Sequence, residues 1–363
     1  MEINPSFWRG KSVFLTGHTG FKGGWMALWL TKMGAKVHGY SLDPPTTPNF
    51  FSTTKLEERL TSSTIDDIQN YSSLKSAISF AKPSVIIHMA AQPLVRQSYF
   101  TPIETLKTNI IGTANLLEVV RKTKGVEAII NITTDKVYDN KEQLKSYTEN
   151  DKLGGYDPYS ASKACAELVS TAYRNSFLKE SDIKIATVRA GNVIGGGDWA
   201  TDRLIPDFFR AIDAGKKLMI RNPESVRPWQ HVLEPLSGYL LLAEKLVTHG
   251  DSFAEAWNFG PQENDVKAVS WIIDYLAKKI PNVKWEIDKA TQPHEAKLLL
   301  LDSTKAKLKL GWLQKLPLEV AIDKCIEWYE AWKDNQSMDE ISSSQINFYE
   351  NFTLKTSKIK NDI

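Results

Sequence analysis

The stretch VFLTGHTGFKGGWMALWLTKMG, residues 13–34, decides the fold. Its first three residues, 13–15, are apolar and predict a short buried strand. A turn spaced as GxxGxxG follows, with its glycines at Gly17, Gly20 and Gly23. The apolar segment 25–33 has the character of a helix that ends near Gly34. A strand that runs through a glycine turn into a helix indicates the first unit of an α/β domain.

This unit also predicts a binding site for a dinucleotide. A second strand is expected over residues 35–43, which completes the strand, turn, helix and strand context that such a fingerprint requires. Glycines let a pyrophosphate approach the unpaired N–H groups at the helix start. Asp43 lies about twenty residues past the turn, where a carboxylate holds ribose hydroxyls, and Ser41 is a competing candidate. Because no arginine stands between Asp43 and Arg59 to meet a 2′-phosphate, NAD is favoured over NADP.

Later strands extend the same pattern. They are expected over residues 84–91, 128–134 and 183–190, with helical stretches between them. The predicted fold class is α/β, a doubly wound parallel (Rossmann) sheet with a smaller C-terminal mixed α/β lobe for the substrate. The predicted division is an NAD-binding domain over 1–190 with a contribution from about 229–262, a substrate lobe over 191–228 and 263–350, and a frayed tail over 351–363.

Composition narrows the class of protein. The 363 residues carry 45 Lys+Arg and 43 Asp+Glu, so the net charge of +2 gives no electrostatic reason to expect a nucleic-acid or membrane partner. No apolar run reaches membrane-spanning length, and the cytoplasm is the expected location. Two distant cysteines, Cys165 and Cys325, exclude a disulfide framework. The six histidines lack metal-binding spacing, so we expect no metal.

Ionisable residues cluster at the end of one predicted strand. In NITTDKVYDN, residues 131–140, Thr134, Asp135 and Lys136 follow an apolar run. Ligands in parallel sheets bind beyond such carboxyl ends. Further along, Tyr159 and Lys163 form YxxxK, which places both side chains on one helix face. A nearby cation favours phenolate, so we expect Lys163 to lower the pKa of Tyr159 and make it a base.

These residues carry a resemblance to a known family. The blocks are VFLTGHTGFKG, HMAAQPLVRQSY, ITTDKVYDN, GGYDPYSASK, VRAGNVIGGGDWA and IRNPESVRPWQHVLEPLSGY. Over nearly all of residues 8–335 the chain resembles the extended short-chain dehydrogenase/reductases, and among them the nucleotide-sugar 4,6-dehydratases. Many relatives carry Glu where this chain has Lys136. In having a lysine there, the chain resembles the branch of the family that acts on CDP-glucose. The resemblance implies a lyase of deoxysugar biosynthesis, which supplies deoxysugars for structures such as the O-antigen of lipopolysaccharide.

The resemblance also implies a reaction cycle. Tyr159 takes the proton of the sugar 4-hydroxyl while NAD⁺ takes hydride from C4, and Thr134 orients the same oxygen. Water then leaves from C5 and C6, with Lys136 as the C5 base and Asp135 as the acid, before hydride returns to C6. These roles require the pKa of Lys136 to fall and that of Asp135 to rise. A structural salt bridge between Asp135 and Lys136 is the alternative.

The predicted binding residues follow the same blocks. The cofactor set is Gly17, Thr19, Gly20, Phe21, Gly23, Asp43, Asp67, Ile68, Ala90, Ala91, Tyr159 and Lys163. The substrate set is Gln92, Asn192, Arg203 and Arg227, because planar guanidinium groups suit a diphosphate. We expect His231 to pack rather than catalyse, and His88 to lie at a strand end near the cofactor.

Two other functions and the assembly stay open at this point. A nucleotide-sugar 4-epimerase would need Tyr159, Lys163 and NAD but no acid–base pair at C5 and C6. A non-catalytic NAD-sensing protein is the second alternative, since fold alone does not imply function. Apolar helices around residues 104–120 and 160–178 resemble those that form an intersubunit bundle in similar proteins, so a homodimer or homotetramer is expected.

Overall fold

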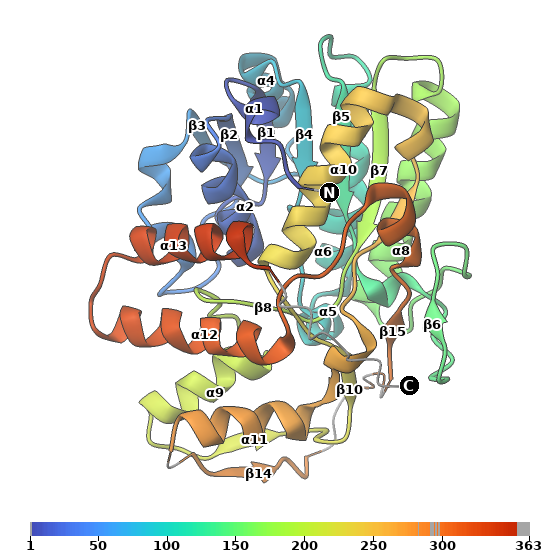
Figure 1. Ribbon diagram of the computed structural model, residues 1–363. Helices are drawn as coiled ribbons and strands as arrows, with labels where there is room; N and C mark the ends of the chain where they lie inside the picture. The colour runs from blue at the N-terminus through green and yellow to red at the C-terminus, as the bar shows by residue number, and fades with distance from the viewer. Residues whose placement is uncertain (1, 282, 291–293, 295, 297, 354–363) are drawn as a thin grey trace, which may run out of the picture.

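A seven-stranded parallel sheet forms the centre of the protein (Figure 1). The computed structural model describes residues 2–281, 283–290, 294, 296 and 298–353. The strand order is β12-β7-β5-β4-β1-β2-β3. These strands are β1 Ser12–Thr16, β2 Lys36–Ser41, β3 Ser62–Ile65, β4 Val85–His88, β5 Ala128–Ile132, β7 Lys184–Arg189 and β12 Ala256–Asn258. Every pairing among them is parallel, which confirms the predicted doubly wound sheet.

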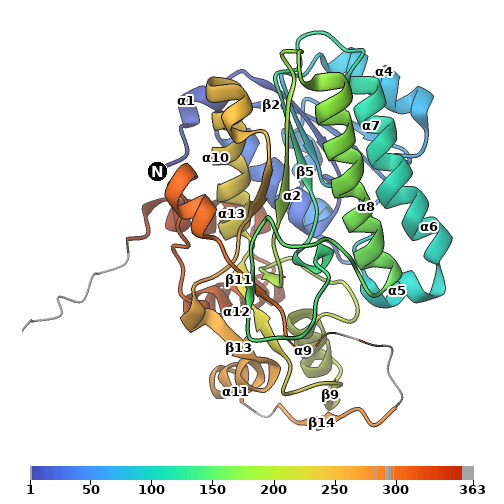
Figure 2. The same ribbon diagram turned by 90° about the vertical axis from the view of Figure 1, so that its right-hand side faces the viewer.

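Helices cover both faces of this sheet (Figures 1 and 2). On one face α2 (Phe21–Lys32) and α10 (Leu233–His249) share a large apolar core with β1, β4 and β5. On the other face lie α4 (Tyr71–Ala81), α7 (Gly112–Val120) and α8 (Pro158–Tyr173), with a second core. Because both faces of the sheet are covered, the central strands β4 and β5 are buried at every position rather than at alternate ones.

The first helix begins earlier than the sequence pattern indicates. We expected it from residue 25, whereas α2 starts at Phe21 with Gly20 as its N-cap. The glycine turn is therefore partly helical. Gly23 lies within the first helical turn, where a Cβ would come 2.0 Å from the Gly17 carbonyl oxygen. Its missing side chain lets the helix start directly above the turn.

The smaller lobe lies below the carboxyl ends of the strands (Figure 1). Its main elements are α9 Leu204–Asp213, β9 Leu218–Ile220, α11 Val269–Lys279, β14 Trp285–Ile287 and α12 Leu318–Lys333. β9 and β14 pair in parallel. The apolar sides of α9, α11 and α12 form a separate core. This lobe closes the space below the sheet that holds the candidate site.

The last helix, α13 (Met338–Asn351), returns to the sheet domain and packs on α2. Trp29 of α2 donates its ring N–H to Glu350 at 2.8 Å, and Tyr349 donates to Glu234 at 2.9 Å. Because α13 contacts the sheet domain, the predicted assignment of all of residues 263–350 to the substrate lobe remains a proposal. Residues 354–363 of the predicted tail lie outside the described part of the chain.

Short elements connect these parts. They are α1 Pro5–Trp8, α3 Phe50–Thr53, α5 Val95–Phe100, α6 Pro102–Leu106, β6 Ser146–Tyr147, β8 Val193–Ile194, β10 Val226–Pro228, β11 Gln230–His231, β13 Val266–Ala268 and β15 Leu300–Leu301. A π-helical turn joins α6 to α7, and another extends α8 to Leu178, so both long predicted helices are present. Within the residues described, no helix has the length and apolar character needed to cross a membrane.

A buried ion pair fixes β5, β7 and α8 to one another. Glu167 of α8 accepts from Arg189 of β7 at 2.8 Å, and the two side chains are only 2% and 3% exposed. Thr133, directly after β5, donates to the same carboxylate at 2.6 Å, and Thr187 of β7 donates to it at 2.5 Å. Burial raises the pKa of Glu167, but Arg189 and the hydroxyl donors outweigh burial and leave that pKa lowered.

We therefore expect Arg189→Met to lower the free energy of unfolding by about 3–5 kcal/mol, since it leaves a buried carboxylate uncompensated. Lys333→Met removes the cation of an exposed pair with Asp213 and should cost less than about 1 kcal/mol. Denaturant-induced unfolding of both variants measures the difference. Equal losses would contradict the anchoring role of the buried pair.

Candidate active site

One large cavity lies between the sheet and the smaller lobe, with a volume of about 1080 Å³. Ligand sites commonly measure about 300–1,000 Å³, so this one has room for more than a single small molecule. It opens at the carboxyl ends of β1, β2, β4, β5 and β7, as expected for a doubly wound sheet.

The glycine turn forms the part of this cavity that fits a pyrophosphate. Gly17 has φ of +80°, and a Cβ there would lie 2.8 Å from the backbone of Met89 and Ala90. A Cβ on Gly20 would contact only the Gly17 carbonyl oxygen, at 3.5 Å. The outer side of Gly20 is therefore open, and a phosphate can approach the N–H groups at the start of α2.

The predicted adenosine-side residues lie together along the cavity. Thr19 shares a 2.8 Å hydrogen bond with Ser41 and donates to the Leu42 carbonyl, which fixes the turn against the end of β2. Asp43, two residues past β2, lines the cavity, as does Ser41, so both candidates for the ribose remain. The other predicted cofactor residues that line it are Gly17, Thr19, Gly20, Phe21, Gly23, Asp67, Ile68, Ala90, Ala91, Tyr159 and Lys163.

The Thr-Asp-Lys sequence forms a single 3₁₀ turn directly after β5. Thr134 is its N-cap, and its hydroxyl accepts from the Lys136 N–H at 3.3 Å and donates to Asp135 Oδ1 at 3.0 Å. The other carboxyl oxygen, Asp135 Oδ2, is buried without a hydrogen-bond partner among the described residues. A Cβ on Gly191 would lie 1.9 Å from Oδ2, so a glycine is required there. All three side chains face the cavity.

The surroundings of Asp135 favour the protonated form that an acid requires. Burial raises the pKa of Asp135, although Lys136, the Thr134 hydroxyl and Arg227 oppose the rise. The predicted direction is confirmed. In the described residues no ion pair within 4.0 Å joins Asp135 to Lys136, which argues against the salt-bridge alternative.

Tyr159 and Lys163 lie one turn apart on α8 and both line the cavity. Lys163 donates to the Ile132 carbonyl at 3.0 Å, which ties α8 to the end of β5. Burial lowers the pKa of Lys163 to about 8, with Glu167 opposing. Burial raises the pKa of Tyr159 to about 12, offset in part by the Thr134 hydroxyl and Arg203. The expected lowering of the Tyr159 pKa by Lys163 is wrong, because desolvation of the phenol is the largest effect on that pKa.

The predicted substrate residues divide into three that line the cavity and one that does not. Asn192, Arg203 and Arg227 line it. Arg203 also donates to Asp198 at 2.8 Å, and Arg227 donates to the carbonyls of Val226 and Ala296. Gln92 does not line it: its side chain bonds Leu94 and Thr105 and shapes the loop after β4.

Neither singled-out histidine faces the cavity. His88 ends β4 but is buried between the Thr16 and Thr113 hydroxyls, at 2.8 and 3.1 Å. His231 packs against Trp25 and accepts from the Leu233 N–H, so the prediction that it packs is confirmed. Burial lowers the pKa of each to about 3. In the described part of the chain, no three His, Cys, Asp or Glu side chains gather so as to hold a metal ion.

The sequence interpretation missed several charged residues of the cavity, Lys22 and Asp198 among them. Lys22 lines it from the first turn of α2 and bonds Tyr239 of α10. An ionisable side chain inside a glycine fingerprint was the signal that could have identified it. Asp198, which holds Arg203, lies within a glycine-rich loop and had no comparable signal.

The fold together with the Thr134, Tyr159 and Lys163 set defines a short-chain dehydrogenase/reductase of the extended type. A family profile described as GDP-mannose 4,6 dehydratase matches residues 14–325. The chain belongs to this family. It is 49% identical over 359 residues to a CDP-glucose 4,6-dehydratase of Salmonella typhimurium. The alignment covers 97% of this chain and 100% of that protein.

Solved structures agree with this fold. A UDP-glucose 4-epimerase of Thermotoga maritima, with UDP-glucose, superposes with a TM-score of 0.75 and 25% identity, covering 88% of this chain and 99% of that one. The dTDP-glucose 4,6-dehydratase DesIV of Streptomyces venezuelae, with NAD and TYD bound, gives 0.75 and 22%, covering 90% and 99%.

We expect Tyr159→Phe to lower kcat by about 10²–10⁴-fold while substrate affinity changes little, because it removes only the proton acceptor. Steady-state kinetics and direct binding measure the two quantities. Tyr156→Phe is a matched control: its ring is 77% exposed and lies outside the cavity lining. Near-normal turnover of Tyr159→Phe would contradict the assignment of Tyr159 as the base.

Proposed function

We propose that the protein is an NAD-dependent CDP-glucose 4,6-dehydratase, a hydro-lyase that forms CDP-4-keto-6-deoxy-D-glucose. The observation that carries this conclusion is the 49% identity to a CDP-glucose 4,6-dehydratase along the full length of both chains. The substrate is accordingly a nucleotide sugar. The cavity supplies independent support, since its residues suit both a dinucleotide and a hexose diphosphate.

The residues that would hold NAD are the glycine turn, Asp43 or Ser41 at the ribose, and Lys163 near the catalytic end. When bound, NAD accepts hydride from C4 of the hexose and later returns it to C6. The turn donates backbone N–H groups to the pyrophosphate. Lys163 reaches the site from a fixed position, because its Nζ is already bonded to the Ile132 carbonyl.

Tyr159 and Thr134 act on the 4-hydroxyl of the sugar. Tyr159 removes the proton of that hydroxyl, and Thr134 orients the oxygen. Since burial raises the pKa of Tyr159 to about 12, its surroundings favour the protonated phenol. Positive charge brought close to the phenol must lower that pKa before Tyr159 works as a base. Arg203 already acts in this direction.

Asp135 and Lys136 divide the elimination of water. Asp135 gives a proton to the departing 6-hydroxyl, a role supported by its raised pKa and its unpartnered Oδ2. Lys136, on the same turn, removes the C5 proton and afterwards donates a proton to C5, after exchange with solvent. Arg203 and Arg227 bind the diphosphate, since guanidinium groups pair with phosphate oxygens in a planar, bidentate way.

A 4-epimerase is the second candidate, because a UDP-glucose 4-epimerase has the same fold. Epimerisation requires hydride exchange at C4 alone. It leaves no role for a buried carboxyl group with a raised pKa beside the base. Asp135 therefore favours the dehydratase over the epimerase.

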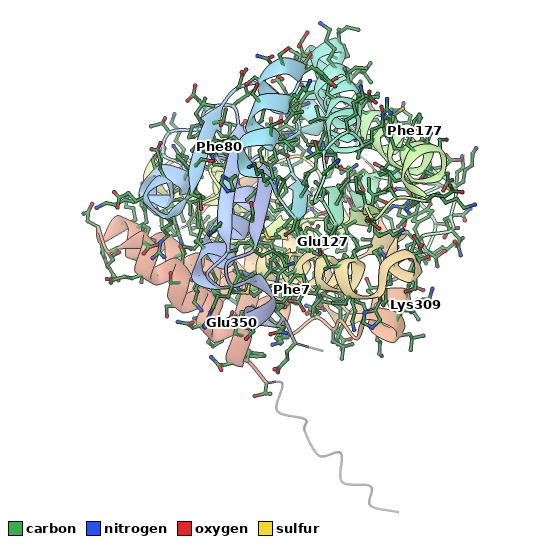
Figure 3. The ribbon with its side chains drawn as sticks, turned by 90° about the horizontal axis from the view of Figure 1, so that it is seen from above. Phe7, Phe80, Glu127, Phe177, Lys309 and Glu350 are labelled. Atoms are coloured by element: carbon green, nitrogen blue, oxygen red, sulfur yellow. The ribbon has the colours of Figure 1, made fainter. Side chains whose placement is uncertain are left out.

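Assembly and location complete the proposal. We infer a homodimer or homotetramer formed through α6, α7, α8 and the π-helical turns that adjoin them. On these elements Ile103, Ile111, Leu168 and Phe177 are 51–60% exposed. Phe177 lies at the outer edge of the molecule in Figure 3. We place the protein in the cytoplasm because both cysteines are free thiols, a state that this reducing compartment maintains.

For the substrate, we expect CDP-glucose to be converted with the highest kcat/KM when it is compared side by side with UDP-glucose and dTDP-glucose. The reason is the likeness to a CDP-glucose enzyme along the entire chain. Product analysis by mass spectrometry, which detects loss of the 6-oxygen, separates dehydration from epimerisation. Equal rates with dTDP-glucose would remove the cytosine preference and leave the reaction class.

For the elimination step, we expect Lys136→Met to permit oxidation at C4 but stop removal of the C5 proton. Absorbance of reduced cofactor should then accumulate without 6-deoxy product, and deuterium from solvent should not enter C5. Asp135→Asn should retain C5 exchange and slow only loss of the 6-hydroxyl. If both substitutions slow every step together and lower stability equally, the pair is structural.

A further inference from the structure

The turn over residues 134–137, which carries both groups proposed for the elimination, is held at each end by one buried ion pair. Before the turn, Thr133 donates to Glu167 at 2.6 Å. After the turn, the Tyr138 hydroxyl accepts from Arg189 Nη1 at 2.9 Å. Glu167 and Arg189 are bonded to each other, so the turn spans two fixed points of a single charged unit.

Tyr138 belongs to the core behind the cavity. It is 1% exposed and is not part of the cavity lining. Its ring stacks on Tyr147 with the centroids 5.0 Å apart, in an apolar cluster with Leu299 and Leu301. Burial raises the pKa of Tyr138, although Arg189 opposes the rise, so its surroundings favour the neutral phenol. A side chain outside the cavity does not touch the sugar, and any effect on the reaction must pass through the turn.

Asn258, the last residue of β12, gives the Tyr138 hydroxyl a fixed acceptor. The hydroxyl donates to Asn258 Oδ1 at 2.6 Å. The amide nitrogen of Asn258 donates to the carbonyls of Tyr147 at 2.8 Å and Asp302 at 3.1 Å, which directs Oδ1 to the phenol. The Asn258 backbone N–H donates to Glu149 at 2.8 Å. The phenol therefore bonds one group on β7 and one on β12, and each of these groups has further partners of its own.

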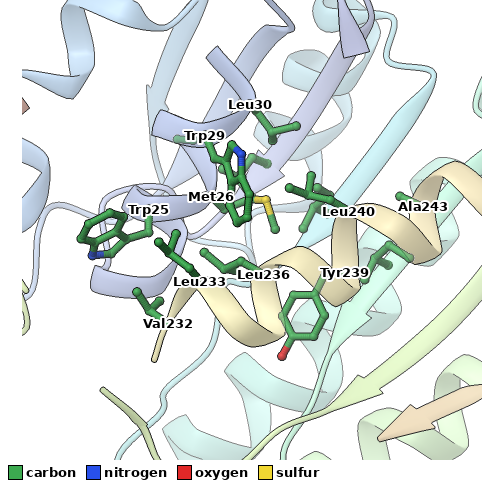
Figure 4. Close-up of a cluster of buried hydrophobic side chains, with 14 of the residues drawn as sticks. Trp25, Met26, Trp29, Leu30, Val232, Leu233, Leu236, Tyr239, Leu240 and Ala243 are labelled. Carbon is green, nitrogen blue, oxygen red and sulfur yellow. The ribbon is translucent and has the colours of Figure 1, made fainter. Parts of the chain in front are cut away.

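These hydrogen bonds fix the end of the turn in direction as well as in distance. Apolar side chains hold α2 to α10 in Figure 4, and the hydrophobic effect between such groups is not directional. Hydrogen bonds are directional, and those to an ionised group are the stronger kind. The backbone adds a further constraint, because the Gly154 N–H donates to the Val137 carbonyl at 2.8 Å and Tyr138 forms a β-bridge with Leu153.

The two ends of the turn serve different steps of the reaction, if the proposed function is correct. Lys136, which removes the C5 proton, lies two residues before Tyr138. Thr134 lies next to the Thr133 anchor, and Tyr159 lies on α8; both act earlier, at C4. We propose that Tyr138 is a positioning residue for the second step, because its hydroxyl holds the backbone of Lys136 where the lysine side chain meets C5. Loss of this hydroxyl slows the elimination and leaves oxidation at C4 nearly unchanged.

Tyr138→Phe tests the inference in the full chain, with bound NAD and with CDP-glucose as the probe. Stopped-flow absorbance of reduced cofactor measures oxidation at C4, and mass spectrometry of the product measures the elimination. We expect cofactor reduction within about twofold of the unchanged protein and 6-deoxy product slowed by about ten- to hundredfold, as a small misplacement of a reacting group causes. The isotope effect of deuterium at C5 on kcat should rise, because proton removal becomes the slowest step.

Tyr147→Phe is the matched control. Tyr147 is 7% exposed and stacks on Tyr138, but its hydroxyl accepts from the Lys141 N–H and donates to Asn140 instead of bonding the ion pair. Its loss should lower the free energy of unfolding without changing the ratio of the two rates or the isotope effect.

Gly154→Ala disturbs the same end of the turn while it retains the Tyr138 hydroxyl. A Cβ on Gly154 would lie 2.8 Å from the Asp139 Cα, so the segment directly after Tyr138 must shift. We expect this variant to slow the elimination selectively as well. It decides the outcome if Tyr138→Phe fails to fold.

Equal slowing of both steps in Tyr138→Phe would overturn the proposal, since it would show a structural role alone. An unchanged elimination rate, or the same change of the ratio in Tyr147→Phe, would also overturn it. Each of these results leaves the proposed function intact. Failure of the unchanged protein to form a 6-deoxy product from CDP-glucose would instead overturn the proposed function, and this inference with it.

Discussion

The buried pair of Glu167 and Arg189 determines how the catalytic elements are placed. One carboxylate receives hydrogen bonds from β7 and from the end of β5, while the helix that carries it also carries Tyr159 and Lys163. Thr133 is one residue before Thr134, so the same interaction fixes the Thr134 hydroxyl relative to the phenol. The pair is fully enclosed and its ordering effect does not depend on a ligand. The active-site geometry is therefore a consequence of the core.

The cavity beside these elements is lined by several cations and by the buried carboxyl group of Asp135. Lys22, Lys163, Arg203 and Arg227 all line it together with Asp135. A nucleotide sugar brings a diphosphate, which the arginines at the lobe side are placed to neutralise. The lysines at the sheet side lie beside the reacting atoms instead. Burial lowers the pKa of both Lys22 and Lys163, so neither is held firmly in the charged state.

The sequence predicted the parts of this arrangement that are local. The glycine turn, the strand ends and the helical spacing of Tyr159 and Lys163 are each set within a few residues, and the parallel sheet follows from their alternation. Side-chain partners could not be predicted. Gln92 bonds its own loop, Lys22 reaches Tyr239 more than two hundred residues away, and the phenol of Tyr159 is governed by burial rather than by Lys163. Each of these depends on contacts between distant segments and on desolvation, which spacing does not encode.

Proton accounting links the two raised pKa values of the site. In the proposed cycle Tyr159 gains the proton of the 4-hydroxyl, Asp135 gives one to the departing water, and Lys136 takes a proton from C5 and later gives one back, with no net change. The reactive state therefore requires an ionised Tyr159 beside a neutral Asp135. Burial raises the pKa of both groups, that of Tyr159 to about 12, and so favours the neutral form of each. One proton must consequently leave Tyr159 as the substrate complex forms. After turnover, transfer of a proton from Tyr159 to Asp135 restores the reactive state. The Thr134 hydroxyl interacts with both groups, since it donates to Asp135 Oδ1 at 3.0 Å and lowers the pKa of the Tyr159 phenol.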